Sequence, residues 1–203
     1  MTRRSHWPES DNVDGPAPPR PGTGRSSTEA GMPVREDPVE RARAICLRLL
    51  TGTPRTRQQL AEALRKREIP DEAAEQVLSR FEEVGLVDDA AFADAWVESR
   101  HHGKGLARRA LARELRTKGV DAATVQEAVD RLDGEQEEER ARALIERRLH
   151  ATRGLDRTRR VRRLAGMLAR KGYPEGLALR VVREALEREG EDGEALEEQF
   201  PDI

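Results

Sequence analysis

Three stretches of the chain share one pattern of apolar and polar positions. They cover residues 60–78, 111–129 and 164–182, and they superpose without a gap. In each stretch, two leucines four residues apart mark one face of a helix, and a short turn leads to a second set of apolar positions at helical spacing. This self-similarity predicts a unit of secondary structure that occurs three times in tandem.

Two of the three turns between these paired helices contain a glycine that is typical of a helix end. Gly119 and Gly172 stand where the first helix of the second and third stretches should end, and glycine adopts the left-handed conformation of a helix end at little cost. Glu68 occupies the equivalent position in the first stretch. We therefore expect the first turn to be built differently from the other two.

Another amphipathic segment precedes each pair, so that each unit comprises three helices and the repeated region about nine. A small helical unit has an apolar stripe that it buries against its neighbours. We therefore predict an all-α fold of three tandem three-helix repeats in an elongated, curved array. The preceding segments are 42–50, 92–100 and 141–149, and the repeats are assigned to residues 39–87, 88–139 and 140–186.

Composition separates the repeats from both ends of the chain. Residues 1–38 hold seven of the eleven prolines and show no apolar periodicity, which indicates a disordered leader. Residues 187–203 hold eight acidic residues and one basic residue, and we expect a frayed acidic tail. No apolar run is long enough to cross a membrane and no secretory signal opens the chain, so we expect a cytoplasmic protein.

The net charge of −2, from 37 basic and 39 acidic residues, conceals an uneven distribution. Residues 39–87 sum to +1, residues 88–139 to −5 and residues 140–186 to +10. The basic third repeat predicts binding to a nucleic-acid backbone or to an acidic protein surface, because arginine pairs with phosphates and carboxylates alike. A solvated face in an arginine-rich protein is the alternative. The candidate binding residues are Arg153, Arg157, Arg159, Arg160, Arg162, Arg163, Arg170 and Lys171, with Lys104, Arg108 and Arg109 as secondary candidates.

No set of side chains indicates catalysis or metal binding. Asp88 and Asp89 stand at the start of a helix, where adjacent carboxylates are typical caps. His101 and His102 lack a third ligand at a metal-binding spacing. We therefore predict a protein that is not an enzyme and that has no metal site and no cofactor.

Two motifs in the second repeat resemble the signature of the RecX family. Residues 85–93 are GLVDDAAFA and residues 114–120 are ELRTKGV, with Trp96, Arg100 and Gly105 between them. The likeness extends from about residue 38 to residue 186, and Glu68 and the proline-rich leader depart from it.

This resemblance implies three tandem three-helix units in a cytoplasmic regulator of homologous recombination and DNA repair. It implies a protein that binds the RecA–DNA filament along its helical groove and inhibits the ATPase and strand-exchange activities of RecA. The implied partners are the RecA filament and DNA, the latter bound weakly through its backbone and without sequence preference. We expect a monomer.

A helical DNA-binding protein, such as a transcription regulator of the helix-turn-helix type, is the alternative from another functional class. A sequence-specific reader needs polar side chains on its recognition helix. The third helices of the predicted repeats are instead rich in alanine, glutamate and valine.

Overall fold

The structure, a computed structural model, describes residues 37–199, with side chains described as far as residue 190. These residues form nine α-helices and one short 3-10 helix, and no strand occurs among them. The predicted disordered leader lies almost wholly outside the described residues. The elements are α1 (Pro38–Gly52), α2 (Arg57–Arg65), α3 (Asp71–Glu83), α4 (Asp89–Lys104), α5 (Arg108–Thr117), α6 (Ala122–Asp130), α7 (Gly134–Leu149), η1 (His150–Thr152), α8 (Arg157–Arg170) and α9 (Glu175–Gln199).

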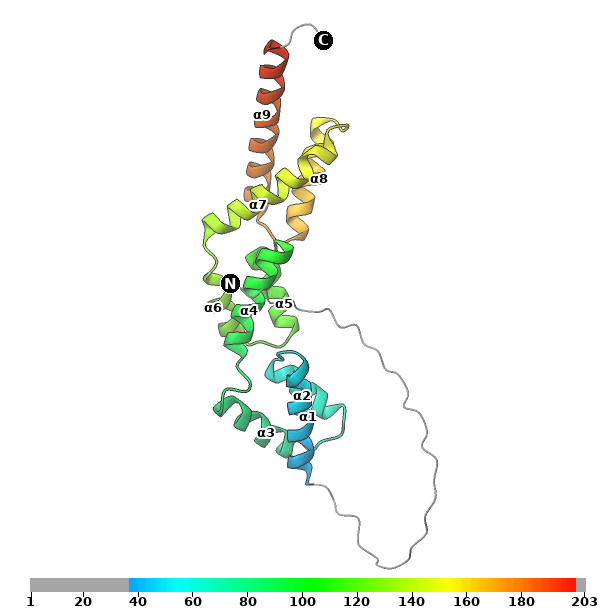
Figure 1. The fold of residues 1–203 in the computed structure, drawn as a ribbon, viewed down its shortest axis with the longest axis vertical. Helices are drawn as coiled ribbons and strands as arrows, with labels where there is room; N and C mark the ends of the chain where they lie inside the picture. Colours follow the sequence, from blue (N-terminus) through cyan, green and yellow to red (C-terminus); the bar gives the residue numbers. More distant parts are fainter. Residues whose placement is uncertain (1–36, 200–203) are drawn as a thin grey trace, which may run out of the picture.

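The helices form three successive three-helix repeats stacked along one long axis (Figure 1). The predicted all-α fold of tandem three-helix repeats in an elongated array is therefore confirmed. Each repeat closes largely around its own cluster of buried apolar side chains, so that the repeats touch through narrow joints. The paired leucines of the sequence pattern are at most 1% exposed, and they are Leu60, Leu64, Leu111, Leu115, Leu164 and Leu168.

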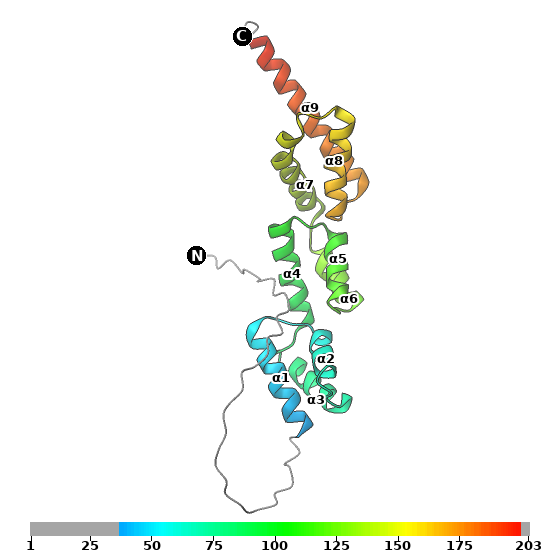
Figure 2. The same ribbon diagram turned by 90° about the vertical axis from the view of Figure 1, so that its right-hand side faces the viewer.

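The second helices of the three repeats, α8, α5 and α2, follow one another along one side of the array (Figure 2). Hydrogen bonds join their ends. The backbone N–H of Ala107 donates to the carbonyl oxygen of Lys171 at 2.9 Å, and the hydroxyl of Thr56 donates to the carbonyl oxygen of Lys118 at 2.6 Å. The negative end of one helix dipole thus meets the positive end of the next. We call this arrangement the helix column.

The boundary between the second and third repeats differs from the sequence prediction. Helix α7 begins at Gly134, so residues 134–139, which we assigned to the second repeat, belong to the first helix of the third. The acidic run in these residues moves with them. Residues 88–133 then sum to −1 and residues 134–186 to +6. The charge contrast between the two repeats is therefore smaller than predicted.

The acidic tail begins as ordered helix. Helix α9 continues from Glu175 to Gln199 with no break at Glu187, where we predicted fraying to start. Glutamate, alanine, leucine and arginine are good helix formers, and the glutamates at 187 and 189 also contact the third repeat, as described below.

All three turns of the repeat use the same backbone conformation, so the expectation of a different first turn is wrong. Glu68 has φ +57°, compared with +83° at Gly119 and +91° at Gly172. The space around each turn explains why two of the turns have glycine and the first has glutamate. A Cβ at Gly172 would lie 2.6 Å from the backbone nitrogen of Ala110, and one at Gly119 would lie 2.2 Å from the side chain of Gln58. Glu68 stands exposed at the free end of the helix column, where no described repeat packs.

Candidate functional site in the second and third repeats

The joint between the second and third repeats fixes several of the candidate residues. The carboxylate of Glu137, which is 4% exposed, accepts from the backbone N–H and the guanidinium Nε of Arg108, both at 3.0 Å. Tyr173 donates its hydroxyl to the carbonyl of Gly105 at 3.2 Å, and the ammonium of Lys171 donates to the carbonyl of Lys104. Arg108 and Lys171 therefore use some of their N–H donors to hold the second and third repeats together.

Burial is also the main cause that lowers the pKa of Lys171, and the nearby charges of Arg140, Arg148 and Lys104 add to it. Lys171 is thus a joint residue with a partly desolvated charge, in contrast to the exposed arginines around it.

The first joint repeats this design. Asp88 caps α4 by accepting from the N–H of Ala91 at 2.8 Å, as predicted. Asp89 instead accepts from the N–H of Arg57 at 2.9 Å and so caps α2 of the preceding repeat. Desolvation raises the pKa of Asp89 above its ordinary value, although the hydrogen bond from Arg57 opposes this shift. In both joints, a carboxylate of one repeat satisfies the N-terminus of the second helix of the repeat before it.

A groove of about 970 Å³ lies where α8 meets α5 in the helix column. Its arginines come from both repeats, and its floor holds small residues such as Ala112, Ala165 and Gly166. Five of its guanidinium groups make no ion pair or hydrogen bond with any side chain or backbone group of residues 37–190. We call it the arginine groove, and these five residues are Arg109, Arg113, Arg116, Arg162 and Arg170.

Two of these five, Arg113 and Arg116, were missed by the sequence analysis. The signal was available, because they follow Arg109 by four and seven residues and so share its helical face. The repeat alignment also matches Arg109 with Arg162. The net charge of each repeat does not reveal this match, because it treats the second and third repeats separately.

A second basic hollow, of about 640 Å³, lies around the same joint. Arg163, Lys171 and Lys104 line it together with arginines of α7, and Arg170 lines both hollows. The structure therefore brings together candidates from separate repeats: Arg162, Arg170 and Arg109 in the groove, and Arg163, Lys171 and Lys104 in the second hollow.

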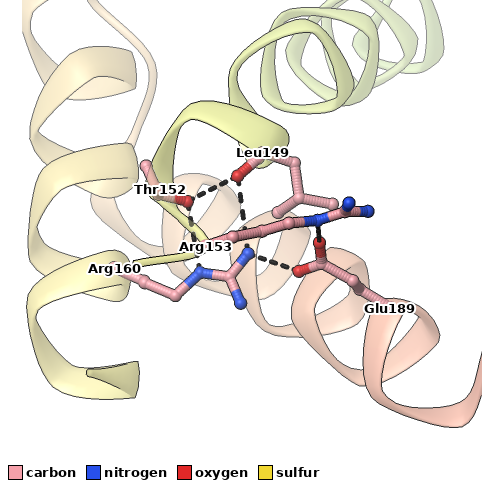
Figure 3. A network of polar contacts seen from close by, with 5 residues as sticks. All are labelled: Leu149, Thr152, Arg153, Arg160 and Glu189. Carbon is pink, nitrogen blue, oxygen red and sulfur yellow. Dashed lines mark hydrogen bonds and ion pairs between the residues drawn. The ribbon is translucent and has the colours of Figure 1, made fainter. Parts of the chain in front are cut away.

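The candidates between η1 and the first turn of α8 are bound to Glu189 of α9 (Figure 3). Arg153 donates from Nε to Glu189 at 2.6 Å, and Arg160 binds the other oxygen of the same carboxylate. Arg160 also donates from Nε to the hydroxyl of Thr152 at 3.2 Å, and that hydroxyl donates to the carbonyl of Leu149 at 2.7 Å. We call these five residues the Glu189 clamp.

The two remaining candidates have acidic neighbours as well. Arg157 lies 3.6 Å from Glu187, and Arg159 lies 3.1 Å from Asp156 one helical turn away. All four side chains are more than half exposed, so these ion pairs contribute little to stability.

Replacing Glu189 by glutamine should loosen the attachment of α9 to the third repeat. Desolvation disfavours the ionised Glu189, but the hydrogen bonds and charges of Arg153 and Arg160 outweigh it and lower its pKa. The stabilising contribution is therefore present above the ordinary glutamate pKa of about 4.3 and is lost as pH falls through the lower folded value. Hydrogen exchange should show faster exchange in the variant around residues 187–190.

The matched variant Glu187→Gln removes only the more exposed contact with Arg157 and should exchange like the unmodified chain. Equal exchange in both variants would contradict a role for the Glu189 clamp.

Comparisons with known proteins identify the architecture. Three family models match in succession: the first three-helix domain of RecX at residues 42–81, the second at residues 88–129 and the third at residues 135–182. The regulatory protein RecX of Streptomyces coelicolor is 77% identical over 174 residues, which cover 86% of this chain and 92% of that protein. The chain belongs to the RecX family. The regulatory protein RecX of Thermobifida fusca is 64% identical over 173 residues, covering 85% of this chain and 94% of that protein.

Solved structures of RecX proteins share the fold. The crystal structure of RecX from Lactobacillus salivarius superposes with a TM-score of 0.68 at 16% identity, covering 72% of this chain and 96% of that one. A crystal structure of a regulatory protein RecX gives a TM-score of 0.63 at 23% identity, with 70% of each chain covered. The RecX family comprises regulatory proteins and is not a known enzyme family.

The described residues also lack the features of two other functional classes, and this holds for their helices and for their possible metal ligands. None of their helices combines the length and apolar character needed to cross a membrane. Residues with described side chains also form no group of three or more histidine, cysteine, aspartate or glutamate residues that could hold a metal ion.

Proposed function

We propose that this protein binds the RecA–DNA filament and inhibits the ATPase and strand-exchange activities of RecA. Membership of the RecX family carries this proposal. The shape of the molecule supports it, since a narrow array of three repeats suits a helical groove and can contact successive subunits (Figure 1).

The basic side chains form a surface on the protein that is suited to this binding. The arginine groove and the second basic hollow meet at one joint and present guanidinium groups from two repeats. Such a surface attracts the acidic faces of a protein filament and the phosphates of DNA alike, and the attraction weakens as salt screens it. Contact with DNA through the backbone alone is weak and independent of sequence.

The test is the ATPase rate of RecA on single-stranded DNA with this protein titrated in. RecA of Streptomyces coelicolor is a suitable enzyme because a RecX protein of that organism is 77% identical to this chain. We expect the rate to fall with added protein, and to fall less at higher salt. An unchanged rate at low salt would overturn the proposal.

The helix-turn-helix alternative predicts a different outcome. A transcription regulator binds one duplex sequence far more tightly than others, typically by a factor of about 10³ or more. Fluorescence anisotropy with duplexes of varied sequence separates the two functions, because a filament regulator should show weak binding without preference that strengthens when RecA is added.

A further inference from the structure

We propose that the arginine groove binds an acidic α-helical segment of a partner protein. On two helices the groove presents guanidinium groups that have no partner among residues 37–190, and its floor consists of small and apolar residues. This inference deepens the proposed function and rests on it for the source of the segment, since the RecA filament would present it. Its test, however, does not need RecA.

The groove arginines differ from Arg108 and Lys171 in their pairing. Several basic residues at the joint already have carboxylate or carbonyl partners, as Arg108 has Glu137 and Lys171 has the carbonyl of Lys104. The five guanidinium groups of the arginine groove have none among residues 37–190, and the groove lining includes only two carboxylates, Asp130 and Glu175. A ligand that brings several carboxylates gains charge-assisted hydrogen bonds, often bidentate with arginine.

The groove arginines are spaced along their helices at intervals that a second helix can match. Arg109, Arg113 and Arg116 follow one another along one face of α5 and span about 10 Å, given a rise of about 1.5 Å per residue. Arg162 and Arg170 span about 12 Å along α8 by the same measure. Carboxylates at positions i, i+4 and i+7 of a partner helix would recur with the same period and face the same side.

Small and apolar residues also line the arginine groove. Ala112, Ala165, Gly166 and Ala169 line the groove with little side-chain volume, and Leu179 adds apolar surface. A helix can therefore bring its backbone close and lay a small or apolar face on this floor, which is the mode by which amphipathic helices dock into grooves. The ligand is then a helix with one apolar stripe flanked by glutamates or aspartates.

Nucleic acid fits the same surface less well. Proteins that hold single strands supply exposed aromatic rings for base stacking. The one aromatic residue in the groove lining, Tyr173, is 2% exposed and bonded to Gly105. A nucleic acid is therefore the outcome against which the proposal is tested.

The experiment measures the binding of a fluorescent helical peptide by anisotropy at low salt. The probe has about 18 residues, long enough to form a helix alone, with glutamates at i, i+4 and i+7 beside a stripe of alanine and leucine. A peptide of the same composition in scrambled order is the control ligand, and a fluorescent oligothymidylate, titrated separately into each variant, is the nucleic-acid probe.

The groove variant carries Arg113→Glu with Arg162→Glu. Its matched control carries Arg48→Glu with Arg183→Glu, two exposed arginines outside the groove that make no ion pair among the described residues. We expect the unmodified chain and the control variant to bind the helical peptide alike, and the groove variant to bind it at least about tenfold more weakly. Circular dichroism confirms that both variants fold.

Three results would overturn the inference. The groove variant and the control variant could bind the helical peptide equally, or the unmodified chain could bind the scrambled peptide as tightly as the helical one. The unmodified chain could also bind the oligothymidylate more tightly than the helical peptide, with only the groove variant losing that binding. The last would make the groove a nucleic-acid site. The RecA assay stays separate. Peptide binding without ATPase inhibition would refute the proposed function and leave the groove, whereas inhibition without peptide binding would refute only the inference.

Discussion

Replacing Gly172 by alanine should lower the free energy of unfolding by between about 2 and 5 kcal/mol. The left-handed backbone at this position, with φ +91°, costs a residue with a Cβ about 1–2 kcal/mol. The added methyl group would also lie 2.6 Å from the backbone nitrogen of Ala110 and 2.7 Å from its Cβ. Forcing extra volume into packed structure costs about 1–3 kcal/mol more, because backbone cannot swing aside as a flexible side chain can.

Gly85 provides the matched control. It has φ +70°, and no atom lies within 4 Å of the position that its Cβ would take. Gly85→Ala should therefore cost only the backbone term of about 1–2 kcal/mol. Urea unfolding followed by circular dichroism measures both variants. If the two variants lost the same free energy of unfolding, the joint between the second and third repeats would accommodate an added methyl group. That result would contradict the close packing of α8 on α5 in the helix column.

Replacing Glu137 by alanine should lower the free energy of unfolding by about 2–3 kcal/mol, the usual range for loss of hydrogen bonds to a buried charged group. The change leaves both the backbone N–H and the guanidinium Nε of Arg108 without their acceptor. The value stays below that of a fully buried ion pair because the Arg108 side chain is 40% exposed and can turn to water.

Glu139→Ala is the control for this second change. Glu139 is exposed on the same helix and should alter the stability by no more than about 0.5 kcal/mol. Glu137→Gln should fall between the two, since an amide oxygen can still accept from Arg108 but carries no charge. Thermal unfolding of the three variants ranks them, and a loss in Glu139→Ala equal to that in Glu137→Ala would contradict the role of the joint.

The fold could be predicted from the sequence because each repeat is specified by residues that lie close together in the chain. The leucine pairs, the capping box of Thr56 and Gln59, and the cap at Asp88 depend on residues at most a few positions apart. Helical periodicity and N-terminal capping are properties of such short windows. The number of repeats and the helices in each could therefore be predicted without tertiary information.

The candidate site was predicted less completely. The chain pattern located the basic third repeat, but the groove draws Arg109, Arg113 and Arg116 from the second repeat, some 50 residues away from Arg162. Charge summed over consecutive residues cannot detect a surface assembled from separate segments. It also overstated the acidity of the second repeat, since the run that ends in Glu139 belongs to α7.

The sequence by itself determined three helical units, their buried faces and the cap at Asp88, because these depend on side chains within a helix or directly before it. Only the tertiary structure decided how the units join. Glu137 reaches Arg108 across 29 residues, and Glu189 reaches Arg160 across the same separation, so these contacts select which arginines have an acidic partner among residues 37–190. Apolar burial fixes a helix's inward face, whereas a salt bridge depends on where two surfaces meet. The arginine groove is a product of that meeting.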